Sequence, residues 1–152
     1  MAKNEGWRSS LETCEPATGR LRVVLRTPTL IEVPNWDPDG ASLLVNGDGR
    51  LWRVAVEGEP ELAAVDTGFA DACNNDHGIS PDGTRIAIGH HAAGSTIYIL
   101  PAAGGTPAQV TTRNPSYWPA GRRTGRRWPS AAIGTGDSTS SPSPPPAARS
   151  GD

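Results

Sequence analysis

The feature that most constrains the fold of this chain is a segment that occurs twice. The peptide that begins at Val33, VPNWDPDGASLLVNGDGRLWRVAVEGEPELAAV, aligns with the one that begins at Asp76, DHGISPDGTRIAIGHHAAGSTIYILPAAGGTPAQV. Their Pro-Asp-Gly triplets start at Pro38 and Pro81, 43 positions apart. A repeat of this length predicts supersecondary units that stack side by side, because one such unit cannot bury its apolar surface alone.

Each copy has the pattern of four short antiparallel strands. Pro-Asp-Gly between apolar runs predicts a tight turn, because Pro presets φ, Asp bonds its own backbone and Gly accepts a positive φ. An extended stretch precedes the turn, and three β-rich runs follow it, at residues 43–45, 51–56 and 61–65 and again at 86–88, 96–100 and 108–112. Four strands in about 40 residues are typical of a β-propeller blade. The predicted fold class is therefore all-β, an incomplete β-propeller of four-stranded antiparallel blades with a disordered C-terminal tail.

The repeat also predicts how the chain is divided. The predicted units are a flexible N-terminus (1–9), a strand pair of a ring-closing blade (10–27), blade one (28–68), blade two (69–113), the start of blade three (114–118) and a disordered tail (119–152). The 18 Gly and 15 Pro residues of the chain agree with a turn-rich β fold, since both residue types are poor in helices.

The tail differs from the rest of the chain in composition. After Trp128 it holds one large aliphatic residue, Ile133, and it ends in SPSPPPAARSGD, so it cannot bury enough apolar surface to offset the entropy of ordering. The turn of blade three is due near position 124, where the chain reads AGRRTG. Codons for this stretch, read one base earlier, permit Gly-Trp-Ser-Pro-Asp-Gly. We interpret the tail as the product of a single-base frameshift close to Trp118 that truncates the propeller; the alternative is a genuine low-complexity extension.

Charge and cysteine content exclude several classes of function. The formal net charge of −2 gives no excess that would favour nucleic acid or an anionic membrane. Cys14 and Cys73 do not have zinc-motif spacing and are expected to be reduced thiols. No apolar run suits a signal peptide or a membrane span, so we expect a cytoplasmic protein without membrane insertion. No nucleophile elbow is present, and no catalytic residue is predicted.

The second copy contains all three histidines of the chain. If its hairpin folds about the Pro-Asp-Gly turn, His77 lies opposite Ile88 and Asn75 lies opposite His90. Alternation along the strands then predicts two polar groups on opposite faces of the sheet. The first group is Asn75, His77 and His90, and the second is Asn74, Asp76 and His91.

The first copy acts as an internal control for these polar residues. At the positions equivalent to 74–77 it has IEVP, and at those equivalent to 90–91 it has GD, so a blade does not require the polar set. Two interpretations remain open, a hydrogen-bonded cap or a ligand-binding site. The candidate ligand-binding residues are Asn75, Asp76, His77, His90 and His91. Imidazole with carboxylate or amide oxygens could hold a divalent metal, with His77 and His90 as ligands, or orient a sugar or peptide. No other cofactor is predicted.

Other large side chains are assigned by their position in the blade. Trp36, Trp52 and Tyr98 are predicted to lie in the core, where blades bury aromatic residues. Arg53 and Arg85 alternate with apolar neighbours and are predicted to lie on solvated faces.

The motifs PNWDPDGASLLV with LWRVAVEGE, and HGISPDGTRIAI with IYILPAAGGTPAQVT, resemble the WD-repeat-like blades of TolB-type propeller proteins, the Tol biopolymer transport type. The resemblance covers about residues 10–118. It implies a complete propeller in the family, of which this chain holds under half, and a non-enzymatic scaffold whose face binds a protein or a polysaccharide. The better-known TolB proteins are periplasmic. The alternative is a fragment of a propeller enzyme, either a metal-dependent lyase of acidic oligosaccharides similar to oligogalacturonate lyase or the propeller domain of a serine peptidase.

Overall fold

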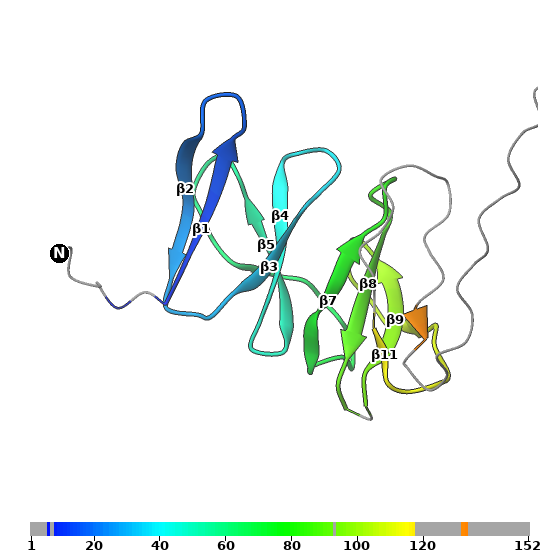
Figure 1. The fold of residues 1–152 in the computed structure, drawn as a ribbon. Helices are drawn as coiled ribbons and strands as arrows, with labels where there is room; N and C mark the ends of the chain where they lie inside the picture. The colour runs from blue at the N-terminus through cyan, green and yellow to red at the C-terminus, as the bar shows by residue number, and fades with distance from the viewer. Residues whose placement is uncertain (1–5, 7, 93, 118–131, 134–152) are drawn as a thin grey trace, which may run out of the picture.

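In the computed structural model the chain is a row of antiparallel sheets, drawn in chain order in Figure 1. The structure describes residue 6 and residues 8–92, 94–117 and 132–133. These residues contain no helix, and thus none that could cross a membrane.

Two four-stranded sheets form the centre of the molecule. Blade one has the order β3-β4-β5-β6, and blade two has the corresponding order β7-β8-β9-β10. A strand pair, β1–β2, precedes them, and a second pair, β11–β12, follows. The strands are β1 (Ser9–Glu15), β2 (Arg20–Thr27), β3 (Glu32–Trp36), β4 (Ser42–Gly47), β5 (Arg50–Ala55), β6 (Ala63–Ala64), β7 (Cys73–Ile79), β8 (Arg85–His90), β9 (Thr96–Pro101), β10 (Ala108–Gln109), β11 (Ser116–Tyr117) and β12 (Ala132–Ile133). The predicted all-β class with four-stranded blades is confirmed.

The Pro-Asp-Gly triplets form the turns that join the first two strands of each blade. In blade one the Asp39 carboxylate accepts from the Ala41 N–H at 2.9 Å, and in blade two Asp82 accepts from the Thr84 N–H at 3.0 Å. The glycines that follow, Gly40 and Gly83, have φ values of 72° and 71°, a region that favours glycine. The same local chemistry therefore produces both turns.

The core lies between neighbouring sheets. Leu44 and Leu51 of blade one pack with Ile86, Ile88 and Leu100 of blade two. The other side of blade one, which carries Leu43, Val45 and Val54, packs against Leu11, Val24 and Leu25 of the β1–β2 pair. Successive residues of β4 point to opposite faces, and both faces are covered, which explains why this strand is a continuous apolar run.

The aromatic core prediction was wrong for Trp36, whose side chain is 51% exposed. Trp36 lies on β3, the edge strand of blade one, and a side chain on an edge strand is covered from fewer directions. Trp52 and Tyr98 are half-buried and pack against the two core clusters.

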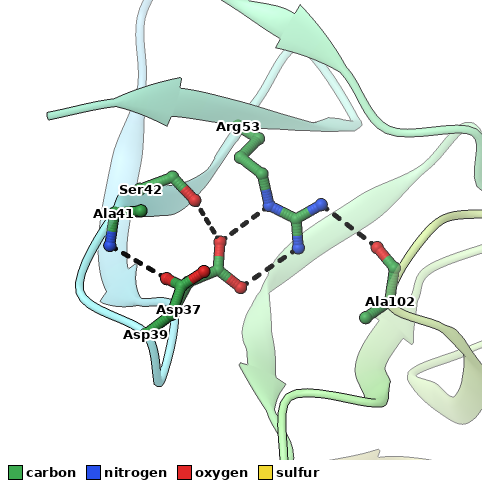
Figure 2. A network of polar contacts seen from close by, with 6 residues as sticks. All are labelled: Asp37, Asp39, Ala41, Ser42, Arg53 and Ala102. Carbon is green, nitrogen blue, oxygen red and sulfur yellow. Dashed lines mark hydrogen bonds and ion pairs between the residues drawn. The ribbon is translucent and has the colours of Figure 1, made fainter. Parts of the chain in front are cut away.

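The expected solvated position of Arg53 was also wrong. Its guanidinium donates from Nε and Nη2 to the two carboxylate oxygens of Asp37, at 2.7 and 3.2 Å, and from Nη1 to the carbonyl oxygen of Ala102 at 3.1 Å (Figure 2). Ser42 donates to the same carboxylate. Because Ala102 follows β9, this network joins blade one to blade two. Arg85 is exposed, as expected.

Two terminal segments were expected to lack structure, and parts of both are in strands. Ser9 begins β1, and the Arg8 N–H donates to the carbonyl oxygen of Thr27 at 2.8 Å, so pairing with β2 orders this part of the predicted flexible N-terminus. Within the predicted disordered tail, Ala132–Ile133 pairs with β11. The remaining residues of those two segments, apart from residue 6, lie outside the described residues.

Candidate functional site

The polar residues of blade two lie where β7 begins and β8 ends. The predicted pairing of His77 with Ile88 is confirmed, but the pairing of Asn75 with His90 was wrong, because His90 pairs with Cys73. A β-bulge between Cys73 and His77 accounts for the difference. Between these two pairs β7 advances four positions and β8 advances two, so β7 contains two extra residues here.

His77 lies in the interface between the blades. Its partner Ile88 packs against blade one, and cross-strand partners point to the same side of a sheet. The His77 side chain is buried, and neither ring nitrogen has a hydrogen-bond partner in the part of the chain that the structure describes. Burial lowers the pKa of His77, and interactions with the backbone of Leu44, Val33 and Asn74 only partly offset this effect. His77 is thus a neutral interior side chain.

His90 is buried in a separate aromatic cluster. Its ring meets those of Phe69 and Tyr98 edge-on, with centroid distances of 6.1 and 6.0 Å. Its Nε2 lies 3.7 Å from a carboxylate oxygen of Asp71, beyond hydrogen-bond distance. Like His77, this histidine packs inside the protein.

The other polar residues surround an open cavity of about 370 Å³. The residues that line it are Asn74, Asn75, Asp76, His91 and Tyr117. Three of the five predicted ligand-binding residues therefore come together here, whereas His77 and His90 do not line the cavity. Sequence reasoning missed Asn74 and Tyr117 as site residues. The signal for Tyr117 was its place at the start of the predicted third blade. Its strand, β11, is tied to blade two because the Ser116 N–H donates to the carbonyl oxygen of Ser95 at 2.6 Å.

Asn74 organises this cavity. Its Oδ1 accepts from the Asp76 N–H at 2.9 Å, and its Nδ2 donates to the Ser95 hydroxyl at 3.2 Å and lies 3.4 Å from Nε2 of His91. A Cβ at Gly89 would collide with the Asn74 side chain, so the glycine makes room for it. These contacts place the backbone of Asp76 and the ring of His91 on one side of the cavity.

The arrangement is specific to blade two. The positions equivalent to Asn74 and Gly89 in blade one hold Ile31 and Asn46. Asn46 instead faces blade two, and its Nδ2 donates to Oδ1 of Asn75 at 2.6 Å. The two blades share their turns and their core but differ at this end.

The structure does not assemble a metal centre from the residues that it describes. Among them, no group of three or more His, Cys, Asp or Glu side chains is placed to hold a metal ion. Cys73 is buried, and burial raises the pKa of its thiol to about 11, so it is a protonated interior residue.

Comparisons with known proteins give the following similarities. No protein-family model matches the chain. An uncharacterised protein of Agrobacterium fabrum is 52% identical over 113 residues, which are 73% of this chain and 39% of that protein. The solved structure of a candidate TolB from Agrobacterium tumefaciens is also 52% identical and superposes with a TM-score of 0.72, over 74% of this chain and 41% of the other.

The chain has the fold of part of a TolB-type β-propeller. TolB from Acinetobacter baumannii superposes with a TM-score of 0.56 at 16% identity, over 73% of this chain and 28% of that protein, which supports the fold alone. This TolB-like chain thus spans about two fifths of the length of its Agrobacterium relatives.

Proposed function

We propose that this chain is part of a non-enzymatic TolB-like β-propeller that binds a protein or a polysaccharide at the end of the blades where β7 begins. The observation that carries the proposal is the cavity lined by Asn74, Asp76, His91 and Tyr117. The fold supplies a rigid support but implies no chemistry of its own, so the function must be argued from this site.

The cavity suits recognition of one unit of a longer molecule. It offers a carboxylate, amide groups, an imidazole and an aromatic ring within about 370 Å³, a volume at the lower end of those that hold small ligands. A cavity of this size that is open to solvent could admit a side chain or a sugar unit while the rest of the partner lies across the surface.

The positions of the histidines favour binding over metal-dependent catalysis. The lyase alternative would use histidine ligands that reach the substrate, but His77 and His90 are 5% and 6% exposed and lie outside the cavity lining. His91, which does line the cavity, is held by an amide of Asn74. The ring of His91 is therefore placed to accept or donate a hydrogen bond to a bound partner.

The test is an array of peptides and oligosaccharides probed with the full chain and two variants. His91→Ala removes a cavity side chain, and the matched control Glu59→Ala removes an exposed side chain from the loop between β5 and β6. We expect the full chain to bind some members of the array. Their binding should be lost in His91→Ala and retained in Glu59→Ala, and the bound molecules should be recovered chemically unchanged. Cleavage of any partner by the purified chain would overturn the non-enzymatic assignment.

A further inference from the structure

The described residues that line the cavity at the start of β7 carry one carboxylate. It belongs to Asp76, and none of these described residues is Lys or Arg. Within the described ranges, no hydrogen bond or ion pair ends on the Asp76 carboxylate. A carboxylate in a cavity, without a cation of its own, favours a positively charged ligand.

The lining of the same cavity includes an aromatic ring. Tyr117 lies on β11, and 51% of its surface is exposed although it lines the cavity. An ammonium or guanidinium group over such a ring gains a cation–π attraction of about 0.5–1 kcal/mol at an exposed site. A carboxylate and an aromatic ring in the lining of one cavity offer a basic side chain an ion pair and a cation–π contact.

The backbone that carries this carboxylate is held in place by hydrogen bonds. The Asp76 N–H donates to Asn74 at 2.9 Å, and Asn74 is in turn fixed by Ser95 at 3.2 Å and by close packing on Gly89. A backbone ordered before binding lowers the entropy that binding must offset.

Further acidic residues lie at the same end of the blades. The β4–β5 turn, which contains Asp48, is tied to the start of β7 because the Cys73 N–H donates to the carbonyl oxygen of Gly49 at 2.8 Å. Asp71, two residues before β7, has a side chain that is 71% exposed. Asp48 and Asp71 add to the attraction for a basic partner, and Arg50, the first residue of β5, partly offsets it.

We propose that this cavity binds the ammonium group of a lysine or the guanidinium group of an arginine in a protein partner, with Asp76 as the counter-charge and the Tyr117 ring as the second wall. This inference rests on the proposed binding function. Of the two partner classes proposed there, a protein and a polysaccharide, it selects the protein. An acidic oligosaccharide would place its carboxylates against Asp76, which costs binding energy.

The experiment uses the isotope-labelled full chain and short glycine-flanked peptides. One peptide carries lysine, one arginine, one acetyl-lysine and one glutamate, and binding is followed by the amide chemical shifts of residues 74–76 and 91. We expect saturable shifts with the lysine and arginine peptides, and at least tenfold weaker binding of the acetylated and acidic peptides. Affinity for the two basic peptides should fall as salt is added.

Variants separate the two contacts. Asp76→Asn keeps the shape of the side chain and should weaken the lysine peptide at least tenfold, whereas Glu59→Gln, the matched loss of one exposed charge, should leave its affinity unchanged. Tyr117→Leu keeps bulk and removes the ring, and should weaken binding severalfold without altering the dependence on Asp76. Far-UV circular dichroism of each variant shows that the fold is retained.

The outcomes distinguish this inference from the function on which it rests. Equal binding of lysine and acetyl-lysine, or no effect of Asp76→Asn, overturns the cation site even if array partners remain sensitive to His91→Ala. Preferential binding of acidic oligosaccharides overturns it as well. If no peptide or oligosaccharide responds to any change in the cavity, both proposals fail together.

Discussion

His77 lies between the two blades with both ring nitrogens unpaired, and this placement makes stability depend on pH. Because burial lowers the pKa of His77 below its ordinary value of 6.5, the unfolded chain binds a proton there more readily than the folded one. The contribution to stability is therefore complete above that ordinary pKa and is lost as pH falls below it. The structure places His77 in the interior, between the blades.

At the residue scale we predict that the free energy of unfolding falls between pH 7.5 and 5.5, and that His77→Leu reduces this dependence. The substitution also removes two unpaired polar atoms. The free energy of unfolding of the variant at pH 7.5 should therefore exceed that of the parent by about 1 kcal/mol. Urea denaturation at several pH values measures both effects. His91→Ala, at an exposed position, serves as control, and an unchanged pH slope in His77→Leu would refute the prediction.

The strands and turns are the elements that local sequence determines best. Pro-Asp-Gly forms the same turn twice because the conformations that it requires are set by the three residues themselves. The bulge in β7 was not predictable from alternation, since alternation assumes one partner for each residue and the bulge adds two residues to β7 between paired positions. The bulge is visible only in the strand pairing: Cys73 and His77 are four positions apart, but their partners on β8 are two positions apart.

For the strands, we predict how much the contact of Arg53 between the two blades contributes to stability. It ties β5 of blade one to the turn after β9 of blade two, and its partner Asp37 is buried. Arg53→Met should destabilise the protein by about 2 kcal/mol, because it leaves the Asp37 carboxylate without its cation. Arg85→Met, which removes an exposed arginine from the start of β8 in blade two, should change stability by less than about 0.5 kcal/mol. Thermal unfolding of both variants measures the difference; equal losses would mean that the tie contributes nothing of its own.

The stability of the whole molecule depends on the apolar core between blade one and blade two. Leu44 is fully buried and contacts a cluster that draws residues from both sheets, so neither blade has a complete core alone. The repeat predicts this interdependence, and the packing shows which residues carry it.

At this scale we expect Leu44→Ala to lower the free energy of unfolding by about 3 kcal/mol and to destabilise both blades in one transition. Denaturation is followed in parallel by tryptophan fluorescence, which reports on the five tryptophans of the chain, including Trp36 and Trp52 of blade one, and by far-UV circular dichroism, which reports on all strands. The comparison measures whether the two transitions coincide. Leu21→Ala, at a side chain that is 65% exposed, is the control. Separate transitions for the two signals would contradict a shared core.

The sequence by itself determined the repeat, the turns, the strands and the division into blades, because each of these follows from residues that are neighbours along the chain. It also indicated that the polar residues of blade two are not needed for the blade, since blade one lacks them. Only the tertiary structure decided which of them are accessible. His77 and His90 are buried, whereas Asp76, His91 and Tyr117 line one open cavity. Burial and convergence depend on what packs against a face, and that neighbour comes from residues far away in the chain.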